Sequence, residues 1–207
     1  MVRVKVCGIT RLEDALVAVE AGVYALGFNF YRRSRRYIEP EAARRIIEQL
    51  PSEVLTVGVF VNEGEPERVA RLALESKVRA VQLHGDESPA YCRALRSLSV
   101  IKALRVKEGF APESVLEYET EAILLDAFDA KERGGTGHTF DWEVARLVGR
   151  LVPRLILAGG LSTENVGEAI EKVQPFAVDA CSSLETEPGI KDQSRVRAFL
   201  AASRVKP

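Results

Sequence analysis

The sequence predicts an α/β protein folded as a closed (β/α)8 barrel, a TIM barrel, that spans residues 1–207 as a single domain. Two observations predict this fold. Short strand-like runs alternate with amphipathic helical segments roughly every 20 to 33 residues, a pattern typical of parallel βαβ units. About eight such units follow one another without a linker or a change of composition, which indicates a barrel. An open doubly wound sheet is the alternative, and the steady count of units favours the barrel.

The expected strands are short runs rich in Val, Ile, Leu and Ala. The first alternates Val4 and Val6 with Lys5 and Cys7, whereas the run that ends at Asp126 is apolar up to its last residue. Taken in chain order, the strands are expected at residues 4–7, 24–30, 54–61, 79–83, 100–104, 122–126, 155–158 and 176–180.

The expected helices have apolar residues at helical spacing and recognisable start signals. Thr10 with Glu13 resembles a capping box, Ser88 precedes a proline, and Ser162 is a suitable N-cap. The segment after Pro112 has the weakest helical pattern. In chain order, the helices are expected after Thr10, at residues 41–50 and 66–75, from Ser88, after Pro112, from Asp141 or Trp142, after Ser162 and from near Asp192.

Composition favours a cytoplasmic protein. A net charge of −1 gives no electrostatic reason to expect nucleic acid or a membrane surface as a partner. No apolar run approaches the roughly 20 residues of a membrane-spanning helix, and the chain begins with a strand pattern rather than a signal peptide. Cys7, Cys92 and Cys181 lack the spacing of a metal site or a disulfide framework, so we expect reduced thiols and no metal.

Cys7 is the first candidate catalytic residue, because active sites of TIM barrels lie at the carboxyl ends of the strands. Lys5 shares its strand face, about 7 Å away. A nearby ammonium group and a following helix N-terminus both favour the thiolate, which can serve as a general base. Two simpler interpretations stay open: Cys7 is a small buried hydrophobic residue, and Lys5 is an ion-pair partner inside the barrel.

Asp126 is the second candidate, at the end of the sixth expected strand. A partly buried carboxyl group there would have a raised pKa and donate a proton. The alternative is a solvated loop residue or a cap for the Gly-rich segment that follows. His84, after Gln82 on one strand face, is expected to line the pocket and form hydrogen bonds. Lys102 is expected in an ion pair inside the barrel rather than in a Schiff base.

Three loops complete the predicted pocket. Among Arg32, Arg33, Arg35 and Arg36, three are expected to be solvated and one to reach over the barrel mouth, where its planar fork suits a carboxylate. Spacing alone does not choose which one.

Gly159 and Gly160 after strand seven, and Asp179, Ser182 and Ser183 at the end of strand eight, occupy the recurrent phosphate site of this fold; tight turns are the alternative. The Gly-rich residues 133–140 are expected to form a mobile loop long enough to cover the site, with His138 exposed on it.

With these residues assembled, the chain resembles the phosphoribosylanthranilate isomerase family over almost its whole length. The resemblance rests on a series of motifs that occur in one order. They are VKVCGIT, GFNFYRRSRRYI, VGVFVNE, VQLHGDE, LLDAF with GGTGHTFDW, LAGGLSTENV and FAVDACSSLETEPGIKD.

The resemblance implies an Amadori rearrangement of a phosphoribosyl aminoaldose to an aminoketose, with no metal or organic cofactor. It implies that Cys7 is the general base and Asp126 the general acid, and that Arg36 holds the anthranilate carboxylate. It also implies that Gly159 and Gly160, together with Ser182 and Ser183, hold the substrate phosphate. The partner is thus a phosphosugar, and the protein is expected to be a monomer or a homodimer.

Two residues depart from the family pattern after Asp179. Cys181 replaces a serine and Ser183 replaces a glycine, so the backbone path of the phosphate loop stays open. If strands one and eight are neighbours, Cys181 also lies near Cys7, and an oxidised Cys7–Cys181 pair is a hypothesis.

Two other functions remain as alternatives. The first is a Schiff-base aldolase, which would need Lys102, or another phosphosugar isomerase. The second is a phosphate-binding module without catalysis.

Overall fold

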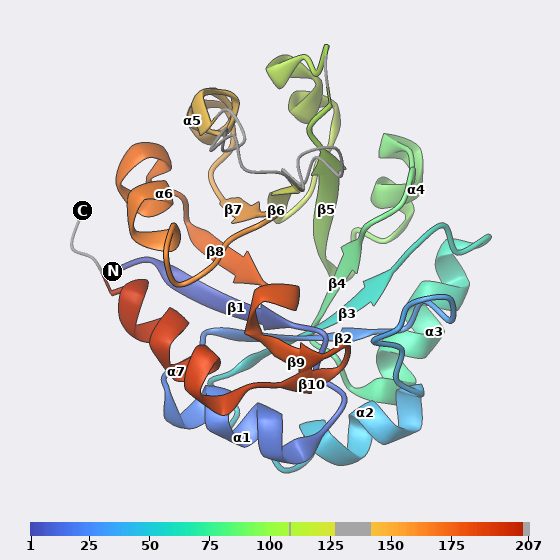
Figure 1. The fold of residues 1–207 in the computed structure, drawn as a ribbon. Helices are drawn as coiled ribbons and strands as arrows, with labels where there is room; N and C mark the ends of the chain where they lie inside the picture. Colours follow the sequence, from blue (N-terminus) through green and yellow to red (C-terminus); the bar gives the residue numbers. More distant parts are fainter. Residues whose placement is uncertain (108, 127–141, 205–207) are drawn as a thin grey trace.

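The computed structural model describes residues 1–107, 109–126 and 142–204. Eight parallel strands close into a barrel in the order β1 to β8, with helices around the outside (Figure 1). This confirms the predicted (β/α)8 barrel. The strands are β1 (Arg3–Cys7), β2 (Ala25–Asn29), β3 (Leu55–Phe60), β4 (Ala80–Leu83), β5 (Ser99–Arg105), β6 (Ala122–Asp126), β7 (Leu155–Ala158) and β8 (Ala177–Ala180).

The connections between strands are mostly α-helices. They are α1 (Leu12–Glu20), α2 (Pro40–Ile47), α3 (Pro66–Ser76), α4 (Pro89–Ala94), α5 (Trp142–Leu151), α6 (Val166–Val173) and α7 (Gln193–Ala202). The segment after Pro112 forms only a 3₁₀ helix, η1 (Pro112–Glu117), and a second 3₁₀ helix, η2 (Ser182–Leu184), follows β8. Within the described residues, no helix has both the length and the apolar character that crossing a membrane requires.

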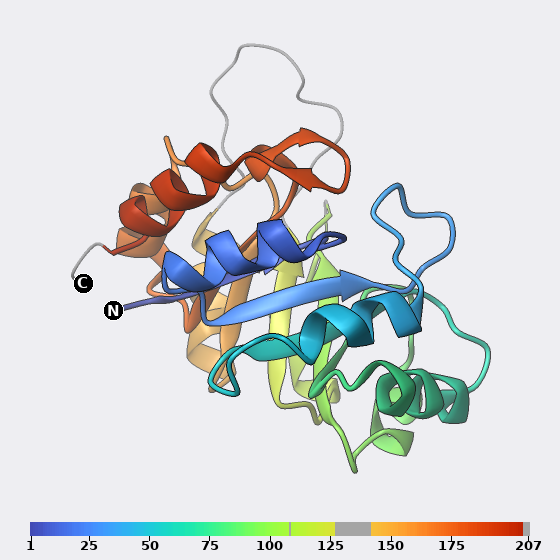
Figure 2. The same cartoon turned by 90° about the horizontal axis from the view of Figure 1, so that it is seen from below.

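The barrel closes between its first and last strands. Lys5 of β1 pairs in register with Asp179 of β8, and Val6 pairs with Ala180. On the outside, α7 lies alongside α1, so the first and last βα units share one side of the molecule (Figure 2). Cys7, the last residue of β1, and Cys181, the first residue after β8, therefore meet at the mouth of the barrel.

Apolar side chains fill both layers of the fold. One cluster lies between the sheet and the helices and includes Phe28, Leu125 and Phe199. A second occupies the barrel interior, with Val57 and Leu124 both fully buried. A filled interior leaves space for a ligand only at the ends of the barrel, which is typical of this fold.

The predicted helix cap at Thr10 is wrong. The Thr10 hydroxyl donates to the carbonyl of Gly189 instead of capping a helix, so α1 begins only at Leu12 and has no side-chain cap. Ser162 caps the turn that leads into α6, since its hydroxyl accepts from the backbone N–H of Glu164 and its carbonyl from that of Val166, although α6 itself begins at Val166. The predicted helix starts at Ser88 and near Asp192 are confirmed, and both residues cap their helices by accepting hydrogen bonds from backbone N–H groups.

A short antiparallel hairpin between η2 and α7 was not predicted from the sequence. Its strands are β9 (Glu185–Glu187) and β10 (Ile190–Lys191). The hairpin is fastened to the first βα unit, because Thr10 bonds to Gly189 and the backbone N–H of Lys191 donates to the Asp14 carboxylate. The hairpin therefore lies beside the barrel mouth.

Candidate active site

A cavity of about 340 Å³ opens at the carboxyl ends of the strands. The structure brings together there every residue that the sequence analysis predicted for the site: Cys7, Arg36, His84, Asp126, Gly159, Gly160, Asp179, Ser182 and Ser183. It also adds Asn29, Gln82 and Cys181 to the lining. The Gly-rich residues 133–140 and His138 lie outside the described residues.

Cys7 is tightly packed at the end of β1. A Cβ atom on Gly27 of the neighbouring strand would lie 2.7 Å from the Cys7 Sγ and 3.2 Å from the Lys5 Nζ, so only glycine fits there. The Lys5 ammonium group and the Cys7 sulfur therefore share one small space on the barrel axis side of β1 and β2. Cys7 is thus placed in polar surroundings at the cavity wall rather than in the apolar core.

The surroundings of Cys7 favour its thiolate. A hydrogen bond with Cys181 and the charge of Lys5 lower the pKa of Cys7 well below its ordinary value, although burial opposes them. The same hydrogen bond, together with burial, raises the pKa of Cys181. The opposite directions of these two changes make Cys7 the thiolate and Cys181 the thiol of the pair, and all three cysteines of the chain are free.

The rate of Cys7 alkylation is expected to reach half its maximum at a pH below about 8.5, which is the ordinary pKa of a thiol. The sign follows from the lowered pKa, since the reactive thiolate then persists at lower pH. Removing the Cys181 thiol with Cys181→Ala should move the half-maximum to higher pH, because the contact with Cys181 is the largest cause that lowers the pKa of Cys7. Iodoacetamide labelling over a range of pH, with Cys7 quantified by mass spectrometry, measures both values; equal profiles in the two proteins would contradict the prediction.

Lys5 and Asp179 form an ion pair beneath the cavity, as one of the open interpretations of Lys5 expected. Their Nζ and Oδ2 atoms are 3.0 Å apart, and both side chains are buried. Burial raises the pKa of Asp179 to about 7, against the attraction of Lys5. Its other oxygen, Oδ1, is buried and has no hydrogen-bond partner within the described part of the chain. That oxygen is an acceptor at the wall of the cavity.

Asp126 is held by a short chain of hydrogen bonds from β4. The amide Nε2 of Gln82 lies 2.8 Å from His84 Nδ1, and His84 Nε2 lies 3.1 Å from Asp126 Oδ2. If the Gln82 amide donates to Nδ1, His84 carries its proton on Nε2 and donates to the carboxylate. His84 therefore orients Asp126 toward the cavity and has a more specific contact than the sequence predicted.

Arg36 is the arginine that reaches the barrel mouth. Arg32, Arg33 and Arg35 are exposed, in agreement with the expectation that three of the four are solvated. The Arg36 guanidinium group binds the buried Glu185 carboxylate, with Nε 2.9 Å from Oε1 and Nη2 2.6 Å from Oε2. This ion pair was not predicted from the sequence, because Glu185 lies 149 residues away on the hairpin.

The loops after β7 and β8 meet at one side of the cavity. Gly159 and Gly160 have φ angles of +87° and +65°, which favour glycine. The hydroxyl of Ser183 donates to the carbonyl of Leu161 at 2.6 Å and so ties the two loops together. Ser183 does not have a positive φ, so its replacement of the family's glycine causes no backbone strain.

Lys102 is buried away from this cavity. Its Nζ lies 2.7 Å from Glu87 Oε2 and also donates to the carbonyls of Leu83 and Gly85. The predicted ion pair is confirmed. All three N–H groups of this ammonium are satisfied by protein atoms, which is unfavourable for a Schiff-base lysine.

Comparisons with known proteins give one consistent result. The family model for N-(5'phosphoribosyl)anthranilate (PRA) isomerase matches residues 4–202. The N-(5'-phosphoribosyl)anthranilate isomerase of Geobacter sulfurreducens is 50% identical over 204 residues, which cover 99% of each chain.

Solved structures agree with this result. A phosphoribosyl anthranilate isomerase in complex with reduced 1-(o-carboxyphenylamino)-1-deoxyribulose 5-phosphate is 45% identical, with a TM-score of 0.88 over 99% of each chain. A structure of monomers generated from the dimeric enzyme of Thermotoga maritima is 44% identical, with a TM-score of 0.87 over 99% of each chain.

Proposed function

The chain belongs to the N-(5'-phosphoribosyl)anthranilate isomerase family, and we propose that it isomerises N-(5'-phosphoribosyl)anthranilate to 1-(2-carboxyphenylamino)-1-deoxyribulose 5-phosphate in L-tryptophan biosynthesis. The reaction is an aldose–ketose isomerisation, an Amadori rearrangement. The observation that carries the proposal for this chain is the single cavity that contains both Cys7 and Asp126, on strands three positions apart around the barrel. Substrate and product have the same composition, so the proposed reaction consumes no oxidant or cofactor.

Asp126 and Cys7 act as acid and base in the proposed mechanism. Asp126 donates a proton to the furanose ring oxygen, and the C1'–O bond breaks to leave a protonated Schiff base. The Cys7 thiolate then removes the proton from C2', and the electron pair of that C–H bond forms an enolamine. Tautomerisation of the enolamine gives the ketone. The lowered pKa of Cys7 supports its part, because a general base must be deprotonated near neutral pH.

The remaining cavity residues bind the substrate in this proposal. Backbone groups of Gly159 and Gly160 with the loop of Ser182 and Ser183 receive the phosphate, because the loops after β7 and β8 are the recurrent phosphate site of TIM barrels. Asp179 Oδ1, buried at the wall and unpaired among residues 1–107, 109–126 and 142–204, accepts a hydrogen bond from a sugar hydroxyl. His84 holds Asp126 in position through its Nε2.

Arg36→Met is expected to raise KM about 10- to 150-fold, with a much smaller change in kcat. Hydrogen bonds to charged groups contribute about 1.5–3 kcal/mol, and Arg36 is assigned to the anthranilate carboxylate rather than to the reacting atoms. Steady-state kinetics measure both constants, with Arg35→Met as the control because Arg35 is exposed. An unchanged KM in Arg36→Met would remove the assigned role.

The function itself is tested by adding synthetic N-(5'-phosphoribosyl)anthranilate to the purified protein. The expected result is a loss of anthranilate-type fluorescence. Chromatography against a standard of the aminoketose should then show that the product, an isomer of the substrate, has formed. The Schiff-base aldolase alternative requires Lys102, so it predicts that Lys102→Met is inactive and that borohydride traps a covalent adduct of the unaltered protein with substrate. The proposed isomerase forms no such adduct. A stable protein without turnover would leave the binding-module alternative and contradict the proposal.

We further propose that residues 1–207 work as one domain in the cytoplasm, as a monomer or a homodimer. The related enzyme of Thermotoga maritima is described as dimeric. Sedimentation velocity over a range of concentrations decides between the two assemblies.

A further inference from the structure

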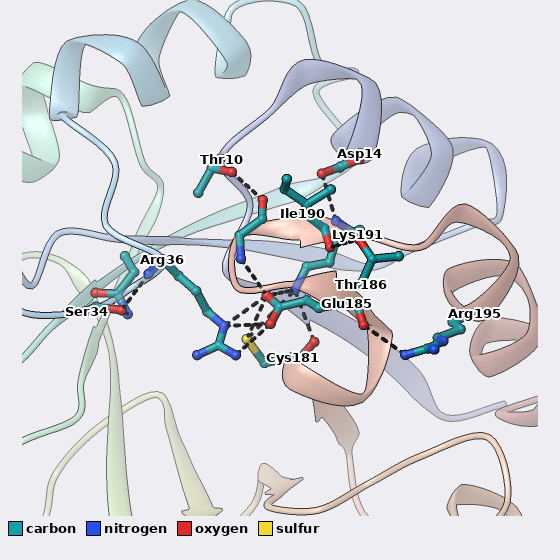
Figure 3. Close-up of polar contacts among 12 residues, drawn as sticks. Thr10, Asp14, Ser34, Arg36, Cys181, Glu185, Thr186, Ile190, Lys191 and Arg195 are labelled. Carbon is teal, nitrogen blue, oxygen red and sulfur yellow. Dashed lines mark hydrogen bonds and ion pairs between the residues drawn. The ribbon is translucent and has the colours of Figure 1, made fainter.

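The Glu185 carboxylate accepts hydrogen bonds from three residues beside the cavity (Figure 3). It lies at the start of β9 and is 6% exposed. Its Oε1 accepts from Arg36 Nε at 2.9 Å, from Lys191 Nζ at 2.9 Å and from the backbone N–H of Gly189 at 3.2 Å. Its Oε2 accepts from Arg36 Nη2 at 2.6 Å. One carboxylate therefore joins the hairpin to the loop after β2.

This carboxylate occupies only one side of the Arg36 guanidinium group. The Nε and Nη2 atoms face Glu185, while Nη1 makes no hydrogen bond to a residue in the described parts of the chain. Figure 3 shows that terminal nitrogen turned away from Glu185. The end of the fork, Nη1 with the second N–H of Nη2, remains for another carboxylate, since a guanidinium group has five donors in a fixed plane.

The charges around Glu185 keep this arrangement ionised. Burial opposes ionisation, but hydrogen bonds from Arg36 and Lys191 lower the pKa of Glu185 below its ordinary value. The same contact with Glu185 raises the pKa of Arg36. The ionised Glu185 thus fixes the plane of the guanidinium group through its contacts with Nε and Nη2 of Arg36.

We propose that Glu185 is a positioning residue that orients Arg36 so that its free end selects substrates bearing a carboxylate on the aromatic ring. The inference rests on the proposed role of Arg36. Without Glu185, the long arginine side chain would regain rotamer freedom, and the carboxylate would lose a preorganised bidentate partner. The competing explanation is that Glu185 serves only to hold the hairpin, through Gly189 and Lys191.

The test compares two ligands that differ only in the ring carboxylate. One is reduced 1-(o-carboxyphenylamino)-1-deoxyribulose 5-phosphate, and the other is the same compound with an unsubstituted phenyl ring. Calorimetry gives the ratio of their Kd values, which we expect to be about 10- to 150-fold in the unaltered protein. In Glu185→Gln this ratio should fall about tenfold. The Kd of the ligand without a carboxylate should hardly change.

Lys191→Met is the matched control. It removes the second cation on Glu185 but leaves the contact with Arg36, so the ratio should stay as in the unaltered protein. Equal weakening of both ligands by Glu185→Gln, with the ratio preserved, would overturn the inference in favour of a purely structural role. A fall of the Kd ratio in Lys191→Met as large as that in Glu185→Gln would overturn the inference as well.

Arg36→Met separates this inference from the proposed function. In Arg36→Met the ratio of the two Kd values should fall to about one. The double variant Arg36→Met/Glu185→Gln should show no further fall, because Glu185 acts through Arg36. An unchanged ratio in Arg36→Met would refute the role of Arg36 itself. A reduced ratio in Arg36→Met with a normal ratio in Glu185→Gln would refute only the role of Glu185.

Discussion

Cys7→Ser and Asp126→Asn are each expected to lower kcat by about 10²- to 10⁴-fold, the usual contribution of a general acid or base, while KM changes little. A serine hydroxyl is not deprotonated near neutral pH, and an asparagine amide cannot donate a proton to the ring oxygen. Neither substitution removes a group assigned to the phosphate or the carboxylate of the substrate. Steady-state kinetics at several pH values measure the effect.

Cys92→Ser is the matched control for the thiol. Cys92 lies on the buried face of α4 and does not line the cavity, so its substitution should leave kcat unchanged. Full turnover in both Cys7→Ser and Asp126→Asn would refute the acid–base mechanism. Weak binding in place of slow turnover would instead assign these side chains to anchoring the substrate.

Lys5→Met is expected to lower the free energy of unfolding by about 3–5 kcal/mol, the usual cost of removing one partner of a buried ion pair. The loss arises because Asp179 stays in the interior without the ammonium group 3.0 Å away, so it must either bind a proton or keep an unpaired buried charge. Denaturant unfolding of the variant and the unaltered protein gives the difference. The double variant Lys5→Met/Asp179→Leu is the control and should recover most of the stability, because apolar pairs often replace buried ion pairs well.

The pH dependence of this loss has a definite sign. Removing Lys5 raises the pKa of Asp179 further above about 7, whereas the carboxyl group titrates near 3.9 in the unfolded chain. Between these two values the folded protein binds the additional proton, so its stability falls by about 1.4 kcal/mol per pH unit as pH rises. The Lys5→Met variant keeps losing stability above pH 7, where the unaltered protein levels off. The difference should thus be larger at pH 8 than at pH 5.

The barrel could be predicted from the sequence because its strands are signalled locally. The β6 and β7 runs have the predicted bounds, since each is apolar and ends abruptly at a polar residue or at glycines. The Thr10 cap failed for a reason that local sequence cannot show. Its hydroxyl bonds to Gly189, 179 residues away, and that tertiary contact replaces the capping box.

The positions of the site residues could also be predicted, because parallel strands place their carboxyl ends at one mouth. The sequence could not show which neighbouring residues orient each site residue and change its pKa. Glu185 and Lys191 are ordinary charged residues in the sequence, and only the hairpin brings them to Arg36 and Cys181. The choice of Arg36 among four arginines came from the family resemblance, not from spacing.

The closure of the barrel between β1 and β8 makes the reactivity of Cys7 a late product of folding. Lys5 and its partner Asp179 are 174 residues apart, and Cys181 belongs to the same final segment. Contacts of such high contact order form only after a large loss of chain entropy. A growing polypeptide that has not yet reached β8 therefore carries an ordinary thiol. The oxidation-sensitive thiolate arises only once synthesis has supplied both ends of the chain.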